Sequence, residues 1–336
     1  MPENITVGPS PHIGKPLSTR KIMIDVIIGL MPAIAAAGYY FRIRAAVLIV
    51  ACVASAVLTE WLCNIIRKKP NSLNDFSAVV TGIILALSLP PALPVWAAII
   101  GSCFAVAIGK MVFGGLGANI FNPAMVGRTF LTACFGMLMT TWTVPATIDP
   151  EMSAIRPDNT AAITQATPLA WSKEAIKSTG TTEMVDEQLK VAFTGSIGGC
   201  LGETSAIALL LGGVYLLARR TINIHIPLAA AGSAAFLAWV FNIIDADTYI
   251  RPVLHLTTGG MLLCIFFIAT DPVTAPLSTK GMWIFGAGVG AITIVIRIFG
   301  EYPEGVMYAV LLMNGATPLI DRFCKLVPAG GKPHVS

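Results

Sequence analysis

The tetrapeptide Ala-Thr-Pro-Leu occurs twice in this chain, and each copy places a threonine hydroxyl, a group that chemistry can use, before a proline. The first copy holds Thr167, in the polar stretch ITQATPLAWS, and the second holds Thr317, in MNGATPLIDR. Pro168 disfavours the α region for Thr167 and presents it on extended backbone. An isolated Thr-Pro pair usually does no more than start a turn, so the surroundings of each copy must decide its role.

Two carboxylates and two amides also stand in largely apolar sequence. Glu203 in LGETS and Asp271 in TDPVT suggest ion coupling, since ionisable groups in such surroundings are costly and often functional. The alternative is a helix-end role, because Asp271 precedes a proline and Glu203 falls in a predicted first helical turn. Asn119 and Asn122, in GANIFNPAMVGR, offer both donors and acceptors, or they cap a helix that starts at Pro123.

Composition indicates which elements must position these groups. The hydrophobic fraction is 55%, mean hydropathy is +0.76 and only 12% of residues are charged, against roughly 25% in a soluble domain. The sequence therefore predicts an all-α polytopic membrane protein, surrounded by the lipid bilayer. A net charge of +4 gives no sign of nucleic-acid binding, and scattered cysteines and histidines predict no metal site.

The apolar runs predict about ten transmembrane helices. We expect them near residues 22–41, 45–66, 77–90, 95–113, 119–140, 199–218, 224–243, 252–270, 281–299 and 304–320. The expected organisation is a cytoplasmic N-terminal segment (1–21), a first transmembrane repeat (22–140), an extracytoplasmic loop (141–190), a second repeat (191–320) and a cytoplasmic tail (321–336).

Charge placement predicts the orientation of these spans. With the N-terminus in the cytoplasm, most basic residues, Lys110 among them, fall on the inner side, as the positive-inside rule requires. Arg42, Arg44 and Arg297 run against this pattern. An odd number of preceding spans then places the 141–190 loop, with Thr167, outside the membrane.

The two halves of the sequence resemble one another. In residues 80–128 and in residues 257–322, the second and third positions are Thr-Gly, and prolines interrupt the apolar sequence that follows. Each range then continues with a glycine-rich predicted helix that ends at Phe-Gly, and finishes with a last predicted helix. Five spans in each half make this a five-plus-five inverted repeat, in which Gly/Pro-interrupted helices mark the binding site. Thr317 lies in the last helix of its repeat, whereas Thr167 lies in an added loop.

Five motifs together resemble the RnfD family, membrane subunits of the Rnf ion-translocating electron-transport complex. They are SPHI (10–13), GGLGANIFNPAMVGRTF (114–130), TQATPLA (164–170), GSIGGCLGETSA (195–206) and ATDPVTAP (269–276). The resemblance covers nearly the whole chain. The related NqrB subunits of the sodium-pumping NADH:quinone oxidoreductase are similar, but usually carry a longer N-terminal extension.

The resemblance implies two flavins. One is FMN joined through its phosphate to the hydroxyl of Thr167, with Thr164 as the upstream hydroxyl and Ala166 as the small neighbour, installed by a flavin transferase. The motif fails at Thr317, where Asn314 holds the upstream position. The family often has Asp six residues before the modified threonine, where this chain has Ala161. The other flavin is a non-covalent riboflavin at Asn119 and Asn122.

The resemblance implies that the chain is a flavoprotein subunit in the cell (inner) membrane, with both termini cytoplasmic. Its partners would be the other Rnf subunits, RnfA, RnfB, RnfC, RnfE and RnfG. The complex would couple electron transfer from ferredoxin to NAD or another acceptor to Na⁺ or H⁺ translocation. The chain has no dinucleotide fingerprint and no cluster-binding cysteines, so it is not catalytically complete alone. A secondary transporter or channel for a small solute is the alternative, because an inverted repeat serves that function equally well.

Overall fold

The computed structural model describes residues 18–69, 72–141, 199–246, 249–300, 302 and 304–325. Thr164, Ala166 and Thr167 lie outside the described residues, as does most of the 141–190 loop. Within the described ranges every regular element is a helix. The all-helical expectation is therefore confirmed for the part of the chain that carries Asn119 and Asn122.

The first half, residues 18–141, forms one group of helices. Its elements are α1 (Thr19–Phe41), α2 (Ile43–Ile66), η1 (Leu73–Asp75), α3 (Ser77–Leu87), α4 (Val95–Val106), the π-helical turn η2 (Ala107–Met111), α5 (Pro123–Cys134) and α6 (Gly136–Met139). The Ser18 hydroxyl accepts from the Lys21 N–H and caps α1, and Arg42, at a φ of 49°, breaks the chain between α1 and α2.

The second half, residues 199–325, forms the other group. Its elements are α10 (Ala206–Ala218), α11 (His225–Ile244), α12 (Pro252–Thr257), α13 (Met261–Leu263), the π-helical turn η3 (Cys264–Ile268), α14 (Thr279–Phe299) and α15 (Val306–Phe323). Gly259, at a φ of 66°, separates α12 from α13, so that backbone breaks inside an apolar run.

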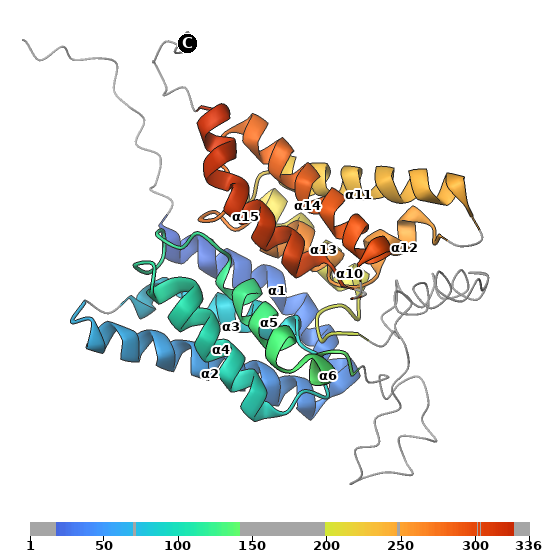
Figure 1. The fold of residues 1–336 in the computed structure, drawn as a ribbon. Coiled ribbons are helices and arrows are strands. Elements are labelled where there is room, and N and C mark those ends of the chain that lie inside the picture. The colour runs from blue at the N-terminus through green and yellow to red at the C-terminus, as the bar shows by residue number, and fades with distance from the viewer. Residues whose placement is uncertain are drawn as a thin grey trace, which may run out of the picture.

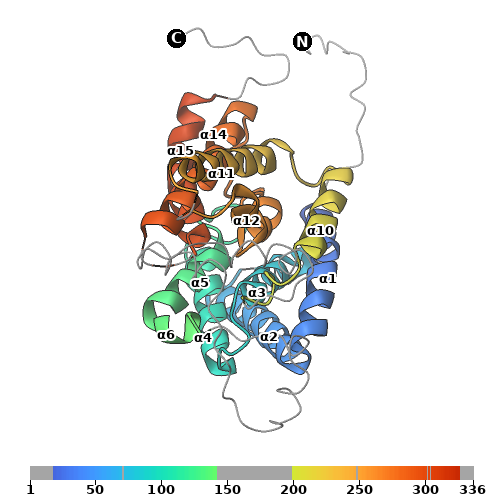
Figure 2. The same ribbon diagram turned by 90° about the vertical axis from the view of Figure 1, so that its right-hand side faces the viewer.

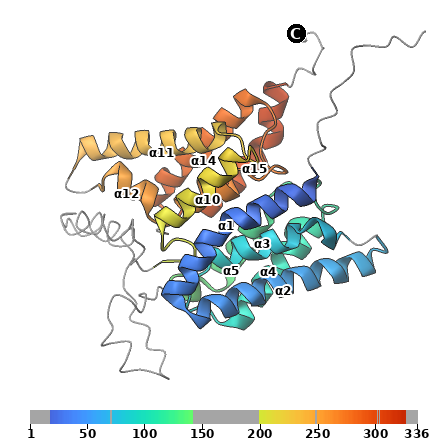
Figure 3. The same cartoon turned by 180° about the vertical axis from the view of Figure 1, so that it is seen from behind.

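The two halves lie side by side, the first half below the second in Figure 1. Within the first half α2 packs against α3 and α4, and α4 packs against α5; within the second, α11 packs against α12 and α14, and α14 packs against α15. Across the boundary α1 packs against α10 and α5 against α15. Figures 2 and 3 place the start of α1 and the end of α15 toward the same side of the molecule.

Four of the described helices are long and apolar enough to cross a membrane. They are α1, α2, α11 and α14. Among the shorter helices, α3, α10 and the α4–η2 pair are apolar. Because many large apolar side chains on α1, α2 and α11 are exposed, these helices have the surface of a multi-pass membrane protein.

Three of the predicted segments differ from the helices that the structure shows. The segment predicted as 119–140 begins only at Pro123, because Asn122 caps it, and it is interrupted at Phe135. The segment predicted from residue 199 begins at Ala206 with Ser205 as its cap, so Glu203 lies in a loop rather than in a first turn. The segment predicted as 252–270 is three short pieces, broken at Thr258–Gly260 and widened into the π-helical turn η3.

Candidate functional site

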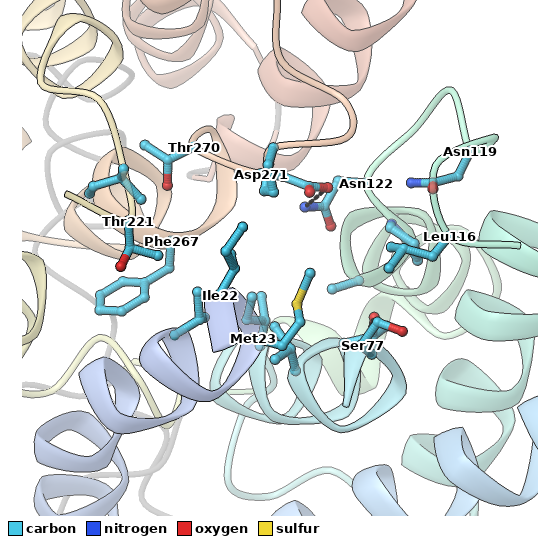
Figure 4. Close-up of a pocket in the computed structure, with 18 of the residues that line it drawn as sticks. Ile22, Met23, Ser77, Leu116, Asn119, Asn122, Thr221, Phe267, Thr270 and Asp271 are labelled. Atoms are coloured by element: carbon cyan, nitrogen blue, oxygen red, sulfur yellow. Dashed lines mark hydrogen bonds between the residues drawn. The ribbon is translucent and has the colours of Figure 1, made fainter. Parts of the chain in front are cut away.

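A cavity opens at the boundary between the two halves, beside the start of α1 (Figure 4). The space inside it that a small molecule can reach is about 60 Å³, several times what a single water molecule needs. Its walls come from α1, α3, η2, the loop before α5 and the segment after η3. This boundary cavity contains both asparagines that the sequence singled out, Asn119 and Asn122.

Asn119 and Asn122 have different partners. The Asn119 amide donates to the Phe121 carbonyl at 3.2 Å, and its buried Oδ1 accepts no hydrogen bond from any described residue. Asn122 Oδ1 accepts from the Met125 N–H at 3.3 Å, so Asn122 is the N-cap of α5, as the capping alternative predicts. Asn119 does not cap that helix, and its free acceptor is available to a ligand.

Asp271 lies next to Asn122 across the boundary between the halves. Asn122 Nδ2 is 3.4 Å from Asp271 Oδ2, as the dashed line in Figure 4 shows. The same carboxylate accepts from the Val273 N–H and the Thr274 hydroxyl, each at 3.2 Å. Asp271 therefore fixes the turn that follows η3, which agrees with the helix-end role, and it also lines the cavity.

A buried lysine forms part of the cavity floor. Lys110 in η2 is 1% exposed and pairs with Glu60 of α2 at 2.8 Å, and its ammonium also donates to the Ser77 hydroxyl at 2.6 Å. The other oxygen of Glu60 accepts from Ser72. Lys110 is therefore a buried, paired charge rather than a solvated one.

The lining of the cavity matches the chemistry of a planar, partly polar ring. The side chains of Met23, Val80 and Phe267 give it apolar walls, while Asn119 offers an unused acceptor at its edge. A flavin ring has apolar faces and donor and acceptor groups along its edge, so the residues present fit such a group.

A second charged region lies beside the start of α10, whereas the boundary cavity is lined by Thr221 and Ile222, shortly after the end of that helix. It consists of Arg128 of α5, Arg297 of α14 and the loop residues Glu203 and Glu304, and we call it the four-charge cluster. Arg128 Nη2 is 3.7 Å from Glu203 Oε1 and 3.7 Å from Glu304 Oε2. Arg297 Nη2 is 3.0 Å from Glu304 Oε1. The charges balance, as buried charges must.

Backbone groups complete the four-charge cluster. Arg297 donates to the carbonyls of His255 and Thr258, which have no partner within the helix because α12 ends there. Glu304 Oε1 accepts from the Gly260 N–H at 3.1 Å, and Glu203 Oε2 accepts from the Cys200 N–H at 3.2 Å. Arg297 is thus a buried structural charge rather than a surface one.

Thr317 has a structural role. Its hydroxyl donates to the carbonyls of Met313, one turn earlier in α15, and Thr274, on the segment after Asp271. Its hydroxyl therefore links α15 to the segment after Asp271. The prediction that the second tetrapeptide copy is structural is confirmed.

Sequence reasoning gave no role to Glu60, Lys110, Arg128 and Glu304. Each is an ionisable residue next to or inside an apolar run, and that isolation was the available signal. Their pairing could not be read from the sequence, since Glu60 and Lys110 are 50 positions apart and Arg128 pairs with residues of the other half.

Comparison with known proteins identifies the relatives of this chain. The family model described as NQR2, RnfD, RnfE matches residues 6–330. The D subunit of the Na⁺-translocating ferredoxin:NAD⁺ oxidoreductase complex of Acetobacterium woodii is 44% identical, covering 96% of this chain and 94% of the relative.

Two further relatives agree. The D subunit of the proton-translocating ferredoxin:NAD⁺ oxidoreductase complex of Clostridium ljungdahlii is 40% identical over 97% of this chain and 96% of the relative. The D subunit of the ion-translocating oxidoreductase complex of Stutzerimonas stutzeri is 41% identical over 95% of each. The chain belongs to the NQR2, RnfD, RnfE family.

Proposed function

We propose that this chain is an electron-carrying membrane subunit of an ion-translocating ferredoxin:NAD⁺ oxidoreductase complex, working with RnfA, RnfB, RnfC, RnfE and RnfG. The names of its relatives support the setting, because they are D subunits of such complexes. Two of them name different ions, Na⁺ and protons, at 44% and 40% identity, so either ion remains part of the proposal. The same names count against a solute transporter or channel.

The proposal includes two flavins, a covalent FMN on Thr167 and a non-covalent riboflavin in the boundary cavity. The observation that carries the second is the buried, unpartnered Oδ1 of Asn119 beside the cavity, which can accept from an N–H on a ring edge. Such groups accept and release one or two electrons when bound. The chain's own part is to orient the ring: Asn119 receives its edge, and Asn122 and Asp271 fix the two backbone segments between which it lies.

Ten spans in a five-plus-five inverted repeat, with both termini cytoplasmic, also belong to the proposal. The matching helix contacts within the two halves support it, as does the pairing of α1 with α10 and of α5 with α15. In this orientation the boundary cavity opens toward the cytoplasm and the 141–190 loop lies outside.

The assignment of Thr167 is tested by co-expressing the chain with a flavin transferase and measuring in-gel flavin fluorescence of the denatured protein. We expect fluorescence in the wild type and in Thr317→Ala, and none in Thr167→Ala. Thr317→Ala is the matched control, since it alters the same tetrapeptide at a hydroxyl that is hydrogen-bonded within the helix group. Absence of covalent flavin from the wild type, with the transferase shown to be active, would exclude this attachment.

A further inference from the structure

Three polar atoms of the four-charge cluster face one small space. Arg128 Nη1, Glu203 Oε1 and Glu304 Oε2 are buried and make no hydrogen bond to any described residue. Their side chains are 4%, 5% and 9% exposed. The 3.7 Å separations between Arg128 Nη2 and the two carboxylates exceed hydrogen-bonding distance. A buried polar atom without a hydrogen-bond partner lowers the stability of the folded protein, so a partner is expected here.

Gly260 locates the space. A Cβ placed on this glycine would lie 3.2 Å from Glu304 Oε2, 3.3 Å from Glu203 Oε1 and 3.6 Å from Arg128 Nη1, and these are its three nearest neighbours. The same three atoms that lack partners therefore border the space that the missing side chain leaves. Because the bordering atoms are all polar, this space suits a small polar molecule rather than an apolar one.

We propose that Glu203, Glu304, Arg128 and Gly260 form a binding site for a single water molecule. Its two O–H groups donate to Glu203 Oε1 and Glu304 Oε2, and its oxygen accepts from Arg128 Nη1. A buried water typically makes about three hydrogen bonds, all to groups otherwise unsatisfied. The site supplies two acceptors and one donor, which matches what a water molecule offers.

Charge selects water over an ion. The two carboxylates already balance Arg128 and Arg297, so a neutral ligand preserves that balance. A cation in this space would face the Arg128 guanidinium, and an anion would face both carboxylates. Either would bring an uncompensated charge into a region from which solvent is excluded.

The water would connect the two halves of the molecule. Arg128 belongs to α5 of the first half, while Glu203, Gly260 and Glu304 belong to the second. Arg128 reaches no carboxylate at hydrogen-bonding distance, so the bridging water supplies the bonds that the direct contact lacks. This inference concerns the end of α10 remote from the cavity and does not depend on the flavin assignments.

The test compares Gly260→Ala with Gly260→Ser in the full chain, purified in lipid nanodiscs. The backbone at Gly260, with φ −72° and ψ 11°, accepts an L residue, so neither variant strains it. The alanine methyl displaces the water and leaves the three atoms unsatisfied, whereas the serine hydroxyl can take its place. We expect Gly260→Ala to lower Tm by about 2–4 °C for each unsatisfied group, and Gly260→Ser to retain most of the wild-type value.

Gly232→Ala and Gly232→Ser are the matched controls, because a Cβ on this α11 glycine meets no atom within 4 Å. Both should leave Tm close to the wild-type value or raise it. Two results would overturn the water site: a Gly260→Ala protein as stable as the wild type, or a Gly260→Ser protein as unstable as Gly260→Ala.

Two further measurements bear on the identity of the ligand. High-resolution density should show one peak within about 3 Å of the three atoms, replaced by the serine Oγ in Gly260→Ser. Wild-type Tm should be equal in NaCl and in choline chloride at the same ionic strength. A rise in Tm that is specific to sodium and lost in Gly260→Ala would replace the water with a cation.

Discussion

The two ends of the boundary between the halves are built differently. Beside the start of α1, the halves leave the boundary cavity, lined mostly by apolar residues and two asparagines. Beside the start of α10, they meet through the four-charge cluster, whose side chains are almost fully buried. α10 has 13 residues, so about 20 Å of helix separates the two ends.

The difference shows how one boundary can both admit a ligand and hold the halves together. At the cavity, mostly apolar side chains line an open space between the halves. A 3.4 Å hydrogen bond between Asn122 and Asp271 crosses the boundary there. At the other end, two arginines and two carboxylates hold three loops and two helices in fixed positions. We expect stability to depend on the second end and ligand content on the first.

Arg128→Met should give the largest loss of stability. It removes the cation that faces both Glu203 and Glu304 and leaves their charge uncompensated, a change that typically costs about 3–5 kcal/mol. The free energy of unfolding in mixed micelles measures the loss. Arg219→Met is the control, since its pair with Asp25 is half-exposed on the arginine side, and such pairs contribute under about 1 kcal/mol. Equal losses in the two variants would contradict the assignment.

Lys110→Met should be nearly as costly, although it lies at the cavity end. The variant leaves Glu60, which is 0% exposed, without its cation, at a cost of about 3 kcal/mol. Adding Glu60→Gln should recover more than half of the loss, because the buried charge is then gone. A double variant no more stable than Lys110→Met alone would show that the ion pair is not the cause.

Asn119→Ala should affect ligand binding and stability, and Asn122→Ala should affect stability. Asn119→Ala removes a free acceptor and should weaken riboflavin binding about fivefold, for a hydrogen bond of about 1 kcal/mol. Because the Asn119 amide also donates to the Phe121 carbonyl, the unfolding free energy of this variant should fall by about 1 kcal/mol. Asn122→Ala removes the cap of α5 and should lower that free energy by about 1 kcal/mol.

Titrating the purified variants with riboflavin and following flavin fluorescence measures the first effect, and denaturant unfolding measures the second. If riboflavin binds Asn119→Ala as tightly as the wild type, the boundary cavity is not its site.

The long helices could be predicted closely from the sequence and the broken ones could not. The predicted segments 22–41, 45–66, 224–243 and 281–299 lie within three residues of α1, α2, α11 and α14. Their apolar runs are continuous, so hydropathy alone determines them. The run 252–270 is equally apolar, yet Gly259 turns the backbone inside it and η3 widens the helix after α13. Hydropathy contains no information about either change.

The candidate site was predictable in its residues but not in its architecture. Paired asparagines before Pro123 stood out by type and spacing, and the structure places both at one cavity. That Asp271 would face Asn122, 149 positions away, depends on how the halves pack. The same limit applies to Lys110. From the sequence it is expected to be a surface charge, and only the packing of α2 shows that it pairs with Glu60.

The π-helical turns η2 and η3 make the site sensitive to the length of the chain. In each, an N–H donates to a carbonyl five residues earlier, from Val112 to Ala107 and from Ala269 to Cys264, both at 2.9 Å. Deleting one residue from either would restore an ordinary α turn and rotate the downstream segment by about 100°. Helix length would hardly change, yet Asn119 and Asn122 in one case, or Asp271 in the other, would turn away from the cavity. Register, as much as residue identity, is what these two turns preserve.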